Sequence, residues 1–184
     1  METTLLQPGQ LAPNFNLPGT LQATSIETHQ KISLHDFRGM PVVLIFYPGD
    51  WNPICGDQLA LYNEILPTFK EHRARLLGIS VDSVWSHLAF SKNNNLHYPL
   101  LSDFEPKGSV AKSYGVYDPL QGTSSRALFV VNPQGQIHWS CLFPTGINPG
   151  ADRLLEALEL IPKQLCRSPF IAETGTEVVH APLS

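Results

Sequence analysis

The stretch Phe46–Gln58, which reads FYPGDWNPICGDQ, constrains the fold of this chain more than any other. An apolar run from Pro41 to Tyr47 leads into it and is typical of a strand buried on both faces. Turn-forming residues follow, and Asn52 and Pro53 then suit the cap and the first position of a helix. These signals predict a strand, a tight turn and a helix, with Cys55 in the first helical turn.

The predicted position of Cys55 favours a thiolate. The first N–H groups of a helix lack partners within the helix, and the helix dipole places partial positive charge there. Such a helix end stabilises an anion by about 0.3–1 kcal/mol, and by up to about 2 kcal/mol when it is partly buried. An ordinary cysteine thiol is mostly protonated at neutral pH, and this free energy alone does not reverse that, so the site also needs a nearby cation.

Arg126 is the candidate cation. It opens an apolar strand at the edge of the predicted core, and its guanidinium stays charged. The fork of donors on an arginine suits a thiolate together with a peroxide oxygen. The alternative is an arginine in a solvated loop, and the residues alone leave both interpretations open.

Composition narrows the class of protein. The chain has 184 residues, 42% of hydrophobic type, which is enough for one domain with a full core. The net charge is −4 and there is no run of Lys or Arg, so we expect no nucleic-acid partner. No apolar segment is long enough to span a membrane, and the N-terminus lacks the features of a signal peptide. We therefore expect a soluble, cytoplasmic protein with no membrane partner.

The cysteines and histidines do not suggest a metal site or a disulfide framework. The three cysteines, Cys55, Cys141 and Cys166, are odd in number and spread out, without a CxxC pair. The histidines do not lie near them at zinc-ligand spacing. We expect neither a metal nor another cofactor. Cys141, on an apolar strand, is expected to be a small buried side chain.

Strand and helix signals alternate along the chain after an N-terminal hairpin within the first 40 residues. The predicted elements are strands at 42–47, 76–81, 98–101, 126–132 and 136–142, and helices at 53–72, 84–93, 109–114 and 152–165, with Trp85, Leu88 and Ala89 facing inward. This order predicts an α/β, thioredoxin-like fold, with a mixed central sheet flanked by helices and an N-terminal hairpin extension. Residues 1–166 would form the domain, and residues 167–184 a C-terminal arm or flexible tail.

The motifs of this chain resemble those of the peroxiredoxins. The active-site signature of that family is Pro, three residues, Thr or Ser, two residues, and the peroxidatic Cys, and Pro48, Asn52 and Cys55 take those places here. The likeness covers roughly residues 8 to 160. It includes the segments 77–83 with His87 and Phe90, 98–103 with 110–116, and 126–131, the last matching the strand that carries the family's active-site Arg.

The resemblance implies a thiol-dependent peroxidase, an antioxidant oxidoreductase that reduces hydrogen peroxide or organic hydroperoxides through a sulfenic acid at Cys55. Pro48 would shield the thiolate from water. Arg126 and the backbone N–H groups of the turn would hold the O–O bond while charge moves onto the leaving oxygen. Trp51 would be a pocket wall or, alternatively, an exposed aromatic at a dimer face.

The chain departs from the family at Asn52, which replaces the usual Thr or Ser. Its amide can donate and accept hydrogen bonds and could serve in part, or it could be only the helix cap. We therefore expect slower peroxide reduction or a shifted substrate. Gln58 stands where many members have Glu, and one branch of the family often has Gln there.

Neither standard resolving thiol of the family is present. Ala60 stands where one branch has a second Cys, and the C-terminal segment 178–182 lacks the Val-Cys-Pro motif of another. We expect a one-Cys cycle with an external thiol or a reductant of the thioredoxin or glutaredoxin type, and Cys166 as an internal resolving thiol is the alternative. Trp51 and the tail are compatible with a homodimer.

Two other functions stay open. A thioredoxin-like disulfide reductase normally uses a second vicinal thiol, which is missing here. A redox sensor or binding protein with weak or no peroxidase turnover would share the same fold, and the fold alone does not separate it from an enzyme.

Overall fold

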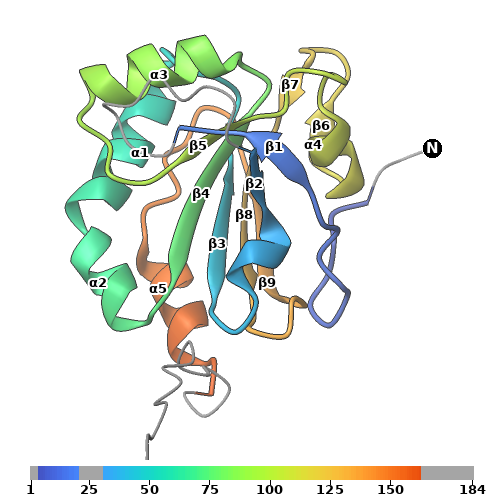
Figure 1. Cartoon of the computed structure of the whole chain (residues 1–184), viewed down its shortest axis with the longest axis vertical. Helices are drawn as coiled ribbons and strands as arrows, with labels where there is room; N and C mark the ends of the chain where they lie inside the picture. The colour runs from blue at the N-terminus through green and yellow to red at the C-terminus, as the bar shows by residue number, and fades with distance from the viewer. Residues whose placement is uncertain (1–3, 21–30, 163–184) are drawn as a thin grey trace, which may run out of the picture.

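A central sheet of five strands organises the fold in the computed structural model, which describes residues 4–20 and 31–162 (Figure 1). The strands lie in the order β5-β4-β3-β8-β9. Their bounds are β3 Val42–Phe46, β4 Arg75–Ser80, β5 Leu100–Ser102, β8 Arg126–Val131 and β9 Ile137–Phe143. β3, β4 and β5 are parallel, whereas β8 and β9 join antiparallel. The predicted thioredoxin-like fold with a mixed sheet is confirmed.

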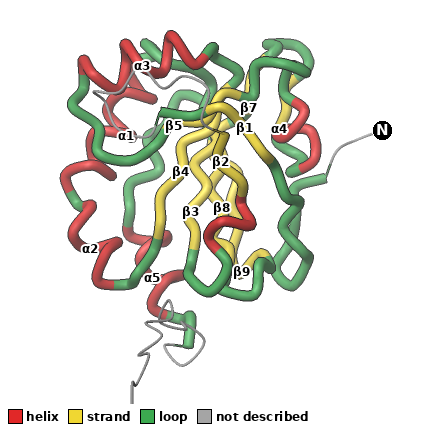
Figure 2. The backbone as a smooth tube through the Cα atoms, viewed as in Figure 1, coloured by secondary structure: helices red, strands yellow, loops and turns green. Residues whose placement is uncertain are grey.

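The helices cover both faces of this sheet, as Figure 2 shows in red around the yellow strands. They are α1 Pro53–Glu64, α2 Leu66–Glu71, α3 Val84–Asn93, α4 Ser109–Ser113 and α5 Asp152–Glu159, with a short 3-10 helix, η1, at Leu34–Phe37. Two small antiparallel pairs complete the fold: β1 Asn16–Pro18 with β2 Lys31–Ser33, and β6 Tyr117–Asp118 with β7 Thr123–Ser124.

The core consists of two layers because successive side chains of a strand point to opposite faces. Along β3, Leu44 and Phe46 pack against the β1–β2 hairpin and α4. Val43 and Ile45 face the other way and pack against α1, α2 and α5. All four are completely buried, as expected for a central strand in a sheet covered on both sides.

The predicted helix from Pro53 to His72 is wrong in one respect, because two helices occupy this segment. α1 ends at Glu64 and α2 begins at Leu66, with Ile65 between them at φ −93° and ψ 16°. Pro67 explains the break. Its nitrogen carries no hydrogen, and its ring clashes with the carbonyl four residues earlier, so a continuous helix is disrupted here.

The predicted inward face of α3 is also wrong. Trp85 is 61% exposed, Ala89 is exposed and Leu88 is only half-buried. The buried side chains of this helix are His87, Phe90 and Ser91. The prediction assumed that the apolar residues face inward. Instead His87 faces inward, because its imidazole contacts the buried carboxylate of Asp50.

Several elements begin or end at other residues than predicted. The second strand of the N-terminal hairpin, β2, ends at Ser33, which caps η1. β5 begins at Leu100, two residues later than predicted. Cys141 is half-buried and not buried, because β9 is an edge strand. α5 ends at Glu159, and Cys166 and the predicted tail at 167–184 lie outside the described residues.

Candidate active site

Cys55 lies where the sequence predicted, in the first turn of α1 and directly after the turn that leaves β3. Asn52 is the helix cap, with φ −72° and ψ 125°. Its side-chain oxygen accepts hydrogen bonds from the backbone N–H groups of Ile54 at 3.0 Å and Cys55 at 3.2 Å. The side chain of Cys55 is completely buried. The predicted cap is therefore confirmed, and it engages the N–H of the cysteine itself.

Arg126 reaches Cys55 through the pairing of two strands. β3 and β8 are antiparallel, and Phe46 at the end of β3 pairs with Ala127. The start of β8 therefore lies beside the turn that carries the cysteine. The Nη2 atom of Arg126 donates to Cys55 Sγ at 3.4 Å. The predicted neighbourhood of these two residues is thus present, and Arg126 is in the interior, not in a solvated loop.

The partners of Arg126 are unusual for a fully buried arginine. Nε and Nη2 donate to the carbonyl of Thr145 at 3.2 and 2.9 Å, and Nη1 donates to the side-chain oxygen of Gln58. Within residues 4–20 and 31–162, no carboxylate lies within ion-pair distance of it. A buried charge is costly without a counter-charge, and the sulfur of Cys55 is a group in direct contact with the guanidinium that could supply one.

Gln58 and Tyr62 orient the arginine from α1. Gln58 follows Cys55 by three positions, so both side chains lie on one face of the helix, and both are completely buried. Gln58 donates to the Tyr62 hydroxyl at 3.4 Å, which in turn donates to the carbonyl of Gly150 at 2.8 Å. Burial raises the pKa of Tyr62 to about 12, against smaller opposing effects of Gln58 and Arg126. Tyr62 therefore stays a neutral donor at physiological pH.

The contact of Gln58 with Arg126 was not predicted from the sequence, where Gln58 stood out only as a residue in place of the Glu of many family members. The spacing of three residues on a predicted helix was the available signal. The carbonyl of Thr145 was not foreseen, because it follows the last strand of the sheet and its position depends on the fold.

Trp51 and Pro48 lie on the turn itself. Pro48 is half-buried. Trp51 is 57% exposed, and its ring packs edge-on against Phe90 of α3, with the ring centroids 5.3 Å apart. This exposure fits the alternative of an exposed aromatic better than a pocket wall.

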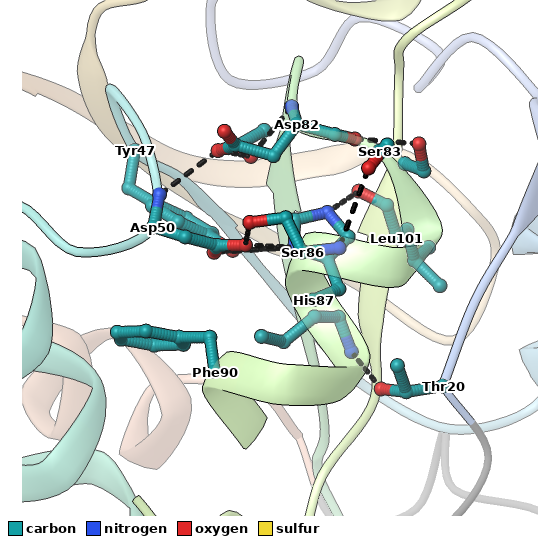
Figure 3. A network of polar contacts seen from close by, with 12 residues as sticks. Thr20, Tyr47, Asp50, Asp82, Ser83, Ser86, His87, Phe90 and Leu101 are labelled. Atoms are coloured by element: carbon teal, nitrogen blue, oxygen red, sulfur yellow. Dashed lines mark hydrogen bonds and ion pairs between the residues drawn. The ribbon is translucent and has the colours of Figure 1, made fainter. Parts of the chain in front are cut away.

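A second group of buried polar residues joins the same turn to α3 (Figure 3). The Nδ1 atom of His87 on α3 lies 3.0 Å from the carboxylate of Asp50 on the turn, and both side chains are completely buried. The hydroxyl of Tyr47, the residue after β3, donates to Asp50 at 2.9 Å. This cluster was not predicted from the sequence, where Trp85, Leu88 and Ala89 were the residues of this helix expected to face inward.

The structure also has a cavity of about 590 Å³ that holds none of these residues. It is lined by Pro41, Glu71, His72, Arg73, Leu158, Glu159 and Ile161. Pro41 precedes β3, and Cys55 follows it, so the cavity and the cysteine lie at opposite ends of the strand. The chemistry of a thiol with an arginine, and not the size of the cavity, therefore identifies the candidate site.

Metal chemistry finds no support in the described part of the chain. No group of three or more His, Cys, Asp or Glu side chains is arranged there to hold an ion. Cys55 and Cys141 are both free thiols in the same part. None of the described helices is long and apolar enough to cross a bilayer. The site that remains is a buried thiol beside a buried cation, an arrangement suited to nucleophilic sulfur chemistry.

Comparison with known proteins gives consistent results. The model of the AhpC/TSA family matches residues 8–140. The 1-Cys peroxiredoxin PER1 of Arabidopsis thaliana is 32% identical over 156 residues, which are 80% of this chain and 71% of that protein. The chloroplastic 2-Cys peroxiredoxin BAS1 of Hordeum vulgare is 33% identical over 171 residues, 86% of this chain and 79% of that protein.

Solved structures show the same similarity. The AhpC of Enterococcus faecalis superposes with a TM-score of 0.75 at 27% identity, over 85% of this chain and 92% of that one. The peroxidoxin BcpB of Mycobacterium tuberculosis gives a TM-score of 0.73 at 29% identity, over 85% of this chain and 99% of that one.

Proposed function

The chain belongs to the AhpC/TSA family and is a peroxiredoxin, a thiol-dependent peroxidase, and from this membership we propose that Cys55 is the thiol that attacks the peroxide and Arg126 the cation that activates it. The observation that carries this assignment is the 3.4 Å contact between Cys55 Sγ and a fully buried guanidinium. The other hydrogen-bond partners of that guanidinium, Gln58 and the carbonyl of Thr145, are neutral.

The reaction proceeds in one displacement at a peroxide oxygen, with the Cys55 sulfur as the nucleophile and solvent as the source of the proton for the leaving group. The Cys55 thiolate donates an electron pair to one peroxide oxygen, an S–O bond forms and the O–O bond breaks. The leaving oxygen takes both electrons of that bond and a proton, and departs as water or an alcohol. Cys55 becomes a sulfenic acid. Arg126 lies where negative charge develops, so its N–H groups stabilise the transition state more than the ground state.

Asn52 takes part through the start of the helix. Its side-chain oxygen accepts from the N–H of Cys55, an N–H that would otherwise be free to bind a peroxide oxygen. The peroxide therefore competes with the cap for this donor. This competition favours slow attack on the peroxide. The second candidate function, a redox sensor with weak turnover, rests on this hydrogen bond between Asn52 and the Cys55 N–H. Pro48, half-buried on the same turn, is assigned to shielding the thiolate from water.

The reduction step is assigned to an external thiol or to a reductant of the thioredoxin or glutaredoxin type. The relatives include both 1-Cys and 2-Cys peroxiredoxins, so their names do not decide between the two cycles. The alternative partner, Cys166, lies outside the described residues. A homodimer, a cytoplasmic location and hydrogen peroxide or an organic hydroperoxide as substrate complete the proposal, although the relatives include chloroplastic proteins.

Stopped-flow mixing of the reduced protein with hydrogen peroxide or cumene hydroperoxide, followed by tryptophan fluorescence, tests the assignment. The expected result is a second-order rate far above that of a free thiol, with Cys55→Ser inactive and Cys141→Ser unchanged. Mass spectrometry should locate the first added oxygen on Cys55. An unchanged rate in Cys55→Ser would contradict the assignment directly.

A further inference from the structure

Cys55 is completely buried, yet the proposed function requires a peroxide and then a reducing thiol to reach its sulfur. Peroxide is small, but a reducing thiol carried by a second molecule must touch the sulfur atom of the oxidised cysteine. The turn 48–52, between β3 and α1, leads directly into the helical turn that holds Cys55. The contacts that hold this turn in place are therefore expected to affect how readily a reductant reaches the sulfur.

The side chain of Asp50 ties the turn to α3. Its carboxylate accepts from the Tyr47 hydroxyl at 2.9 Å and from the Ser86 hydroxyl at 2.7 Å. The Nδ1 atom of His87 lies 3.1 and 3.0 Å from its two oxygens. Among residues 4–20 and 31–162 this is the only contact within 4.0 Å between a carboxylate and the nitrogen of a basic side chain. Figure 3 shows the three partners around Asp50, Tyr47 from the residue after β3 and Ser86 and His87 from α3.

The other ring nitrogen of His87 fixes the direction of this contact. Nε2 lies 3.0 Å from the backbone carbonyl of Leu101 in β5. A carbonyl only accepts hydrogen bonds, so Nε2 must be the donor there. The imidazole is thereby held at both ends, with Nδ1 facing the carboxylate of Asp50. His87 thus connects the turn before Cys55 to a strand of the central sheet.

The backbone of the turn needs this support. Trp51 has φ 64°, in the left-handed region that a bulky side chain rarely adopts. Such a conformation persists where neighbouring contacts enforce it. On one side the Asp50 N–H donates to the carboxylate of Asp82 at 2.8 Å, and on the other the Trp51 ring packs on Phe90. Weakening the hold on Asp50 would let the turn relax away from this backbone conformation.

We propose that the buried contact between Asp50 and His87 is a latch that holds the turn 48–52, which leads into the helical turn of Cys55, in its folded conformation, so that the strength of this contact sets how easily large thiol reagents reach the sulfur. Asp50 and His87 are positioning residues, since neither touches the sulfur or Arg126. The proposed function enters this proposal at one point: it gives the latch its purpose, which is to control the access of an external reductant. The latch itself is a property of the reduced protein and is measurable without peroxide.

Two substitutions of His87 separate the latch from general packing. The side-chain nitrogen of Asn takes a place near Nδ1, and that of Gln a place near Nε2. His87→Asn therefore keeps a donor towards Asp50 and loses the one towards Leu101, whereas His87→Gln does the reverse. Both variants are neutral and remove the ring. Tyr114→Phe serves as the control, because it removes another buried hydrogen bond, 2.8 Å from the Tyr114 hydroxyl to the Pro13 carbonyl, on the opposite face of the sheet.

The measurement is the rate of alkylation of Cys55 by fluorescein maleimide, which is bulky, relative to iodoacetamide, which is small. Peptide mass spectrometry assigns the label to Cys55 and not to Cys141 or Cys166. We expect His87→Gln to raise the ratio of the two rates by about tenfold, the size expected for loss of a hydrogen bond to a charged group. The ratio for His87→Asn and for Tyr114→Phe should stay within about twofold of that for the unmodified protein, because both variants keep a donor towards Asp50.

An equal rise in both His87 variants, or an unchanged ratio in His87→Gln, would overturn the latch. Ser86→Ala provides a milder test if the His87 variants fold poorly, since it removes only one donor to Asp50. It should raise the ratio by a smaller factor, and no rise there would also count against the proposal. Because no peroxide is used, a failure of the latch and a failure of the proposed peroxidase chemistry give different results.

Discussion

Arg126 and Cys55 are 71 residues apart in the chain, yet the guanidinium donates to the sulfur at 3.4 Å in a site that excludes water from both side chains. Charges interact far more strongly in such surroundings than at a solvated surface, because little solvent screens them. The helix end contributes about 0.3–2 kcal/mol to an anion, which is too little alone. The arginine is therefore placed to add its attraction for an anion to that of the helix end.

The first prediction concerns the charge of Arg126. Arg126→Met keeps the length of the side chain and removes the charge, and should lower the second-order rate with hydrogen peroxide by about 100- to 1,000-fold, as for loss of a donor to a developing oxyanion. Arg126→Lys keeps a charge without the fork and should fall between the two. Stopped-flow rates and thiolate absorbance at 240 nm provide the measurement. A methionine variant as fast as the unmodified protein would refute the role of the charge.

The second prediction concerns Gln58, which now gives Arg126 a neutral acceptor. Gln58→Glu places a carboxylate in the same position, so the guanidinium gains a counter-charge that competes with the sulfur. We expect the thiolate absorbance of the reduced protein at neutral pH to decrease, while the fold becomes no less stable in urea. Gln58→Met, which offers no carboxylate, is the matched control. The explanation fails if the two variants show the same thiolate absorbance.

The local part of the site was predictable from sequence, and the long-range part was not. A cap at Asn52, a proline at the first helical position and a preceding apolar strand are signals within a dozen residues, and they placed Cys55 correctly. Arg126 depends on the antiparallel pairing of β3 with β8, which no local pattern encodes. Its residue type and position left it undecided, and only the family resemblance pointed to it.

The errors have a common physical origin. The burial of His87 was not predicted, because it depends on a carboxylate from a segment 37 residues away. The same tertiary pairing turns Trp85 outward. The break after Glu64 differs from these, since Pro67 was visible in the sequence and its effect on the helix is local.

The third prediction is a loss of stability at alkaline pH. Burial raises the pKa of Tyr62 to about 12, and it also raises the pKa values of Tyr47, Tyr98 and Tyr114. The unfolded chain releases these protons near pH 10, the ordinary value, so between pH 10 and about 12 the folded protein binds more protons than the unfolded one. Stability must then fall as pH rises through this window.

Urea unfolding at a series of pH values, with tyrosinate absorbance at 295 nm, measures this effect. Tyr62→Phe should make the decrease less steep, because one of the four groups no longer titrates. Stability that stays level from pH 10 to 11 would show that the tyrosines ionise equally in both states.

The last prediction concerns Asn52, whose oxygen occupies the N–H of Cys55 at 3.2 Å. Threonine is also an effective cap, so Asn52→Thr should change the free energy of unfolding by only a few tenths of a kcal/mol, whereas Asn52→Ala should lower it by about 0.5–2 kcal/mol. The small hydroxyl of threonine can rotate to meet both sulfur and peroxide, which the planar amide does less well. We therefore expect Asn52→Thr to react faster with hydrogen peroxide than the unmodified protein, in stopped-flow experiments on the reduced forms. Asn52→Ala frees the N–H of Cys55 but supplies no hydroxyl, so its rate should rise less. Equal rates for the threonine variant and the unmodified protein would mean that the helix cap, and not the lost hydroxyl, is all that this position contributes.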